Sequence, residues 1–226
     1  MTDPHLLDRP VWNTLNTGWF NLALGDARAL RLHPDYGPFG AAADFSTPNL
    51  DALAELVPVG DEVWTAETGD RPMPADLKVL RTAELHQMIA EQLTPLSTDA
   101  DIVRLEESDA GEMRALALLT EPGPFFPRTN RLGDFFGVKQ QGRLVAMAGE
   151  RMKLGGFAEV SGVCTHPEHR GHGLAGALMS VVAQKIVARG EIPFLHSYSS
   201  NTGAIALYER LGFRLRKQII VTVLSR

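Results

Sequence analysis

Residues 168–179 read EHRGHGLAGALM, and this stretch decides the fold because it places glycines where a helix begins. Glycine inside a helix costs about 0.5–1 kcal/mol relative to alanine, so Gly171, Gly173 and Gly176 indicate a need for bare backbone here. The preceding residues 157–165, FAEVSGVCT, are typical of a strand. A glycine turn between a strand and a helix exposes several N–H groups at the positive end of the helix dipole. The stretch therefore predicts an anion site that suits a diphosphate.

Two common phosphate-binding patterns do not account for this turn. The Walker pattern is missing, because no Lys-Ser or Lys-Thr pair follows the glycines. The dinucleotide pattern GxGxxG matches, but a Rossmann unit also needs an acidic residue that closes the next strand. Here Glu191 precedes that strand instead. Dinucleotide binding is therefore the weaker interpretation.

The whole chain has the composition of an ordinary globular protein. It has 226 residues, of which 44% are hydrophobic and 22% are charged. No run of about 18 apolar residues predicts a membrane span, and the first residues lack the apolar core of a signal peptide. A single cysteine, Cys164, excludes an internal disulfide and is expected to be a buried strand residue. We therefore expect a cytoplasmic protein without a membrane partner.

The charges are distributed unevenly along the chain. Residues 1–98 hold 6 basic and 14 acidic side chains, whereas residues 99–226 hold 16 basic and 13 acidic ones. The acidic half argues against nucleic-acid binding, which needs clustered Lys and Arg. The mildly basic half can accept a small polyanion.

The order of expected elements predicts an α/β (α+β) fold with a boundary at residue 98. Residues 99–226 read as strand, helix, hairpin, strand, helix, strand, helix and strand, which indicates a mixed central sheet flanked by helices. Residues 1–98 predict a smaller α/β domain. In that half we expect a hairpin at Gly25-Asp26, a helix from Thr47, and a short strand followed by a helix over 77–93.

Two segments resemble the signatures of the GNAT superfamily of N-acetyltransferases. The acetyl-coenzyme A signature, Arg/Gln-x-x-Gly-x-Gly/Ala, is met by Arg170, Gly173 and Ala175. The segment NTGAIALYERLGF, residues 201–213, is similar to the second signature, an Asn seven residues before a Tyr and then Leu-Gly-Phe. The resemblance covers residues 99–226. The divergent half that precedes it resembles the layout of the glycine N-acyltransferase-like branch.

The resemblance implies that acetyl-coenzyme A is the co-substrate and that particular residues bind it. The end of the strand would pair with the pantetheine arm, the glycine turn would hold the pyrophosphate, and an asparagine would hydrogen-bond the pantetheine. The implied binding residues are Val163, Cys164, Thr165, Arg170, Gly171, His172, Gly173, Leu174, Ala175, Gly176, Asn201 and Tyr208. Tyr208 would also be catalytic, because a phenol with a pKa of about 10 is protonated at pH 7 and can protonate the departing thiolate.

Two residues are candidates for the base that removes a proton from the amine. Glu159 lies where the glycine N-acyltransferase-like branch has its base, and an apolar strand environment would raise its pKa. His196 is the rival, with an intrinsic pKa of about 6.5. Each has a structural alternative: Glu159 as a solvent-facing residue, His196 as a satisfied strand histidine, and Tyr208 as a core aromatic residue.

No metal is expected. His166, His169 and His172 are three residues apart, a spacing that fits neither HExxH nor a zinc finger. They occupy the variable positions of the glycine turn.

The sequence thus predicts an N-acetyltransferase that moves an acetyl or short acyl group to the amine of a small molecule such as an amino acid. The transfer would be a direct attack within a ternary complex. The N-terminal half and the loop at residues 122–134 would enclose the acceptor, and Arg128 and Arg131 could hold a carboxylate there or belong to a packed connector. A catalytically silent acyl-coenzyme A sensor and another kind of nucleotide-binding module are the alternatives. A homodimer, the acceptor and the acyl length are left open.

Overall fold

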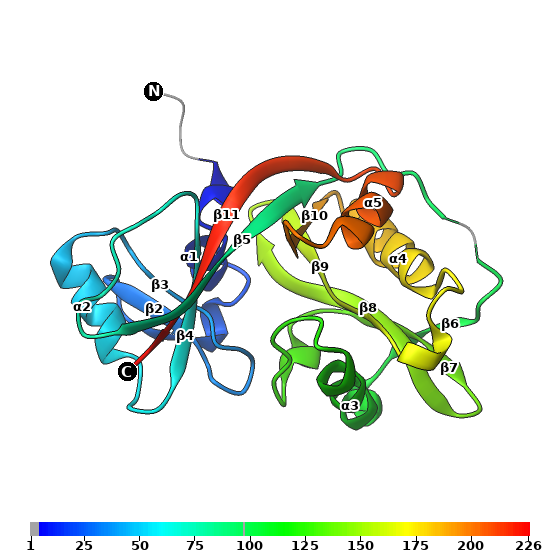
Figure 1. Ribbon diagram of the computed structural model, residues 1–226, viewed down its shortest axis with the longest axis horizontal. Coiled ribbons are helices and arrows are strands. Elements are labelled where there is room, and N and C mark those ends of the chain that lie inside the picture. The colour runs from blue at the N-terminus through cyan, green and yellow to red at the C-terminus, as the bar shows by residue number, and fades with distance from the viewer. Residues whose placement is uncertain (1–4, 97) are drawn as a thin grey trace.

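The computed structural model describes residues 5–96 and 98–226, and it places strands from both halves in one eight-stranded sheet (Figure 1). The strand order is β4-β11-β5-β10-β9-β8-β7-β6. All neighbours are antiparallel except β9 and β10, which are parallel. The predicted mixed sheet is therefore confirmed. The strands are β4 (Glu62–Glu67), β5 (Lys78–Ile89), β6 (Ile102–Leu105), β7 (Phe135–Gln140), β8 (Arg143–Leu154), β9 (Phe157–Thr165), β10 (Ile192–Tyr198) and β11 (Arg214–Ser225).

The remaining elements surround this sheet. A small antiparallel sheet in the N-terminal half contains β1 (Ala23–Gly25), β2 (Ala29–Leu32) and β3 (Gly40–Ala42). The helices are α1 (Pro10–Leu15), α2 (Thr47–Glu55), α3 (Ala110–Thr120), α4 (Leu174–Ala188) and α5 (Thr202–Arg210). Figure 1 shows α1 and α2 at one end of the molecule and α3, α4 and α5 at the other, with β5 and β11 extending between the two ends. None of the helices in the described residues is both long and apolar enough to cross a membrane.

Local sequence signals explain several of these boundaries. The turn between β7 and β8 has positive φ at both Gln141 (51°) and Gly142 (77°), which suits a tight two-residue hairpin. Pro48 lies in the first turn of α2, where its missing N–H costs no helical hydrogen bond. Asn201 caps α5 by accepting a hydrogen bond from the backbone N–H of Ala204 at 3.2 Å.

The expectation of a short strand and a helix over residues 77–93 was wrong. Residues 78–89 form one twelve-residue strand, β5, which pairs with β10 on one edge and with β11 on the other. Partners on both edges satisfy its backbone groups, and this tertiary pairing outweighs the helical preference of residues such as Ala83 and Glu84. Since β5 lies between two strands from beyond residue 98, the sheet is continuous across the expected boundary. The division into two domains stays a prediction.

The sheet is covered on both faces. Phe194 and Leu195 are neighbours on β10 and therefore point to opposite faces. Leu195 packs in the cluster that contains α4, whereas Phe194 packs in the cluster that contains Leu7 and α1. The N-terminal segment is thus part of the second core, and it closes the face on which β10 also carries His196.

Candidate active site

Strand β9 separates from its neighbour β10 after three residue pairs. Residues 157–159 pair with residues 192–194, and the described residues give no further pairing between the two strands. The other edge of β9 stays on β8 as far as the pair of Thr165 with Ala146. The open edge borders a cleft of about 300 Å³ that is lined by Val163, Cys164 and Thr165. An open strand edge offers N–H and C=O groups to an extended ligand.

The glycine turn lies next to this cleft, at the start of α4. Gly171 and Gly173 have φ of 83° and 73°, and among the described residues no heavy atom lies within 4 Å of the position of a Cβ on either. Gly173 is the N-cap of α4. Glycine is needed at position 176 for a different reason: a Cβ there would lie 2.9 Å from Leu96 and 3.1 Å from Leu207. The first two glycines therefore leave the helix terminus open to an anion, whereas Gly176 allows close packing.

The other candidate binding residues divide between the cleft and its surroundings. Those that line the cleft are Val163, Cys164, Thr165, Arg170, Ala175, Asn201 and Tyr208. His172 is exposed in the turn, and its Nδ1 lies 3.2 Å from the carbonyl oxygen of His169. Leu174 is buried in the core beneath α4 and does not line the cleft.

One polar atom in the cleft is without a partner. The Oγ1 of Thr165 is buried and makes no hydrogen bond within the described residues. A buried hydroxyl without a partner costs about 1–3 kcal/mol. The backbone N–H and C=O groups at residues 163–165, which have no pairing with β10 in the described residues, match the amide groups of an extended ligand such as pantetheine, so this edge of the cleft fits coenzyme A.

Tyr208 lies where this cleft meets a second cavity. The second cavity measures about 200 Å³ and shares Val163, Asn201 and Tyr208 with the cleft. Burial raises the pKa of Tyr208, which outweighs the opposing effect of its hydrogen bond with Ser197. The phenol is therefore protonated at neutral pH and can donate.

The second cavity is enclosed largely by residues that the sequence did not single out. The N-terminal half contributes Phe39, Trp64, Ala66 and Leu85, and the loop after α3 contributes residues 121–124. Both segments therefore border the cavity beside Tyr208, and the expectation that they enclose the acceptor stays a prediction.

The arginine in this cavity is Arg151 of β8, and neither Arg128 nor Arg131 lines it. Arg128 lies 3.5 Å from a carboxylate oxygen of Asp35, and Arg131 is hydrogen-bonded to Glu107. The two loop arginines thus stabilise the connector.

Glu159 is held by two partners. Arg151 donates from Nε and Nη2 to its two oxygens at 2.8 and 2.7 Å, and Nδ1 of His196 lies 2.8 Å from Oε1. Burial pushes the pKa of Glu159 upward, but the charge of Arg151 and the hydrogen bonds of both partners outweigh it and lower the pKa to about 2. The expectations of a raised pKa and of a solvent-facing side chain are both wrong, because Glu159 is 1% exposed and ion-paired.

Gln87 fixes the other side of His196. The Oε1 of Gln87 accepts a hydrogen bond from Arg216 at 2.7 Å, and its Nε2 donates to the carbonyl of Leu7 at 2.9 Å. These contacts orient the amide, so Nε2 also donates to Nε2 of His196 at 3.1 Å. In this arrangement Nε2 of His196 is the acceptor, and its Nδ1 faces Glu159.

Comparisons with known proteins agree with this geometry. A solved structure from Novosphingobium aromaticivorans, assigned as an acetyltransferase of the GNAT family, is 49% identical over 99% of both chains, with a TM-score of 0.92. This chain belongs to the GNAT family. A family model described as FR47-like protein matches residues 135–221. No curated protein sequence matches the chain.

More distant GNAT structures share the fold. A GCN5-related N-acetyltransferase from Kribbella flavida is 18% identical, over 95% of this chain and 93% of its own, with a TM-score of 0.63. A GCN5-related N-acetyltransferase-like protein from Streptococcus suis is 15% identical, over 98% of this chain and 94% of its own, with a TM-score of 0.58. Both cover nearly the whole chain, so the likeness extends to the N-terminal half.

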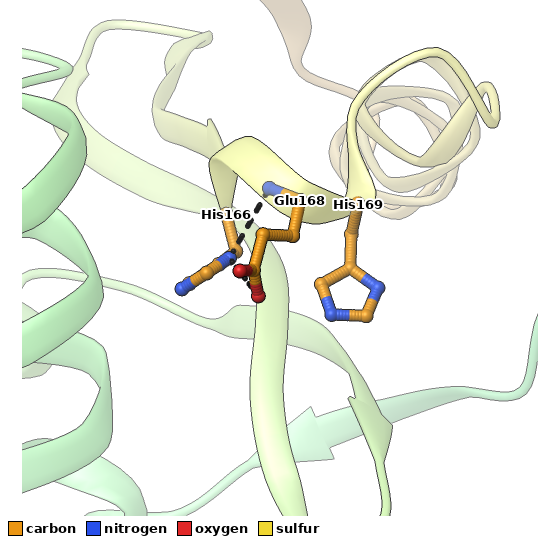
Figure 2. A group of neighbouring side chains, drawn as sticks. All are labelled: His166, Glu168 and His169. Atoms are coloured by element: carbon orange, nitrogen blue, oxygen red, sulfur yellow. Dashed lines mark hydrogen bonds and ion pairs between the residues drawn. The ribbon is translucent and has the colours of Figure 1, made fainter.

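A histidine cluster lies beside the glycine turn of this GNAT domain. Figure 2 shows His166, Glu168 and His169, whose ligand atoms all lie within 4.8 Å of one another. Nδ1 of His166 accepts a hydrogen bond from the backbone N–H of Glu168 at 3.3 Å, which leaves Nε2 as its available nitrogen. The sequence analysis considered His166, His169 and His172 together. In the structure the third member of the cluster is Glu168 instead of His172. The expectation that the protein uses no metal stays a prediction.

Proposed function

We propose that the protein transfers an acetyl or short acyl group from coenzyme A to the amine of a small molecule, such as an amino acid, as in the glycine N-acyltransferase-like branch of the GNAT family. The observation that carries the proposal is the junction of two cavities at Tyr208. One cavity has the strand edge and the glycine turn that suit coenzyme A. The other is large enough for a small acceptor and opens onto the same phenol.

In this proposal each part of the cleft has one task. The open edge of β9 at residues 163–165 pairs with the pantetheine arm, and the turn at Gly171 and Gly173 receives the pyrophosphate beside Arg170. Asn201 keeps its Oδ1 on the helix cap and offers its amide N–H groups to the ligand. When bound, coenzyme A supplies an acyl group activated as a thioester.

Tyr208 serves as the general acid. The amine nitrogen attacks the carbonyl carbon to form the C–N bond, the C–S bond breaks, and Tyr208 gives its hydroxyl proton to the departing sulfur. The nitrogen loses one proton as the amide forms, and a proton from solvent restores the Tyr208 hydroxyl. Burial supports this role, since it keeps the phenol protonated until a thiolate develops beside it.

The contacts around Glu159 and His196 do not favour either side chain as the base. A carboxylate with a pKa of about 2 is a poor acceptor for the proton of an ammonium ion. His196 lines the acceptor cavity, but its Nε2 lone pair is occupied by Gln87. We assign His196 to the wall of the cavity and Glu159 to the layer behind it, where the charge of Glu159 cancels that of Arg151. The amine then reacts as its free base, having lost its proton to solvent.

The acceptor's own pKa should therefore govern the pH profile. The inflection of kcat/KM should move when one amine is replaced by another of different pKa. An inflection that stays at one pH for both amines would instead identify a group of the protein as the base.

Release of coenzyme A thiol from acetyl-coenzyme A tests the proposal as a whole. Amino acids, simple alkylamines and polyamines are offered separately, and the rate is compared with that in the absence of acceptor. At least one amine should accelerate thiol release, and mass spectrometry should show its acylated product. Tight coenzyme A binding without acceptor-dependent release would indicate a sensor. A cytoplasmic location and a homodimer stay predictions.

A further inference from the structure

One wall of the cavity that Tyr208 borders is apolar and comes from three adjacent strands. Trp64 and Ala66 are two residues apart on β4 and share a face. Val221 of β11 lies directly opposite Ala66 and also opposite Ala83 of β5, and Leu85 lies two residues beyond Ala83. Register therefore places four of the cavity's side chains on one face of the sheet.

The aromatic part of this wall is fixed in place. Phe39 meets Trp64 in a tilted edge-on contact, with ring centroids 6.5 Å apart, and the two residues are joined by a β-bridge. Arg81 lies over the Trp64 ring at 4.7 Å, and the indole N–H donates to Glu62 at 3.3 Å. The polar end of the indole is thus satisfied, and the part of the ring that Arg81 does not cover is available as an apolar surface.

The charged groups of the cavity are already paired or lie at its edge. Arg151 uses Nε and Nη2 on Glu159, and its guanidinium lies 4.9 Å from the centroid of Phe39. Glu121 is exposed in the loop after α3. A polar group of the acceptor would lose hydration against the apolar wall without gaining a partner there, whereas an apolar group gains by leaving water. The uncharged polar side chains of the cavity, among them Ser197 and Asn201, come from β10 and the start of α5 instead.

We propose that the acceptor is an amine borne on an apolar group about the size of a phenyl ring. This inference rests on the proposed function. The amine lies at Tyr208 and the apolar group lies against Trp64, Leu85 and Val221. The volume of about 200 Å³ is sufficient, since an apolar cavity of about 150 Å³ in another protein holds benzene.

Two sources share this chemistry, namely plain alkyl or arylalkyl amines and apolar amino acids. Arg151 distinguishes them, because its Nη1 makes no hydrogen bond within the described residues and could receive a carboxylate. Phenethylamine and L-phenylalanine differ by that carboxylate alone, so their comparison shows which source the cavity accepts.

The test is a series of amines at saturating acetyl-coenzyme A. We expect kcat/KM to rise about fourfold per added methylene from ethylamine to n-butylamine, and phenethylamine to exceed ethanolamine and spermidine. Trp64→Ala should reduce this rise of kcat/KM with acceptor size, and Trp64→Phe should retain most of the rise. Val59→Ala changes a residue that is 87% exposed and outside the cavity, so it should leave the series as it is.

The possible failures can be told apart. Thiol release that is as fast with ethanolamine or spermidine as with phenethylamine would overturn the inference and leave the acyltransferase proposal standing. No release with any amine would overturn both. If Trp64→Ala loses coenzyme A affinity because it misfolds, Val221→Thr, which replaces a methyl group by a hydroxyl at nearly constant volume, is used instead. If Val221→Thr binds coenzyme A normally and its kcat/KM series is unchanged, the proposed contact between the acceptor and the apolar wall is contradicted.

Discussion

Replacing Glu159 by Gln should reduce stability by an amount that depends on pH in a defined direction. Folding lowers the pKa of this carboxyl from an ordinary value of 4.5 to about 2, and such a shift corresponds to about 3 kcal/mol. Since the folded pKa is the lower one, this stabilisation is complete above pH 4.5 and is lost as the pH falls toward 2. At pH 3.5 about 1–1.5 kcal/mol of it should already be gone.

The variant also leaves Arg151 buried without its counter-charge. Breaking one member of a buried ion pair costs about 3–5 kcal/mol, so we expect a loss of that order at pH 7. Urea unfolding at pH 7 and pH 3.5, evaluated by linear extrapolation, gives both values. The difference in free energy of unfolding between the parent and Glu159→Gln should be smaller at pH 3.5 than at pH 7.

Glu67 provides a matched control, because folding shifts its pKa in the opposite direction. It is also buried and paired with an arginine, Arg9, but burial raises its pKa despite the opposing effect of Arg9. The stability linked to Glu67 is therefore greatest at low pH and falls as the pH rises. The difference in free energy of unfolding between the parent and Glu67→Gln should therefore be larger at pH 3.5 than at pH 7. If both variants show differences that do not change with pH, the assignment of these two carboxyl pKa directions is refuted.

Three further predictions concern other parts of the site. Gly173→Val should weaken coenzyme A binding about 100-fold or more by calorimetry, through the loss of charge-assisted hydrogen bonds, whereas Gly60→Val, a similarly strained change in the turn between α2 and β4, should not. Burial raises the pKa of Cys164 to about 11, so a thiol reagent at pH 8 should label it only after unfolding; rapid labelling of the native protein would contradict the buried position. Treatment with EDTA followed by desalting should leave acceptor-dependent thiol release unchanged, and a loss that added Zn²⁺ restores would assign a role to His166 and His169.

Much of the fold could be predicted from local signals. The glycine turn, the hairpin at Gln141-Gly142 and the asparagine cap of α5 are all encoded within a few residues. The strand β5 could not be found in this way. Its hydrogen-bonding partners come from β10 and β11, more than 100 residues later in the chain, and only those partners make an extended conformation favourable over 78–89.

The same distinction applies to the site. The residues proposed to bind coenzyme A lie in two short segments with recognisable motifs, and most of them line the cleft. The state of Glu159 was missed because it depends on Arg151 across a strand pair and on His196 of another strand. Gln87 was missed because it contacts His196 only when residues 78–89 form a strand, whereas the sequence predicted a short strand and then a helix there. Arg151 was missed because β8 is buried on both faces and its pairing with β9 is irregular between Glu150 and Lys153, so no simple alternation predicts where this side chain points.

The central claim is that Tyr208 acts on bound coenzyme A as a proton donor, and the Tyr208→Phe protein tests it most directly. The change keeps the ring, which packs at 6.5 Å from Phe213, and removes only the hydroxyl. Calorimetric titration with coenzyme A should give nearly the parent affinity, while kcat should fall about 100-fold or more. Tyr36→Phe, which changes a tyrosine outside both cavities, should keep the parent values of both. If Tyr208→Phe turns over at the parent rate, the account of catalysis at this junction is contradicted.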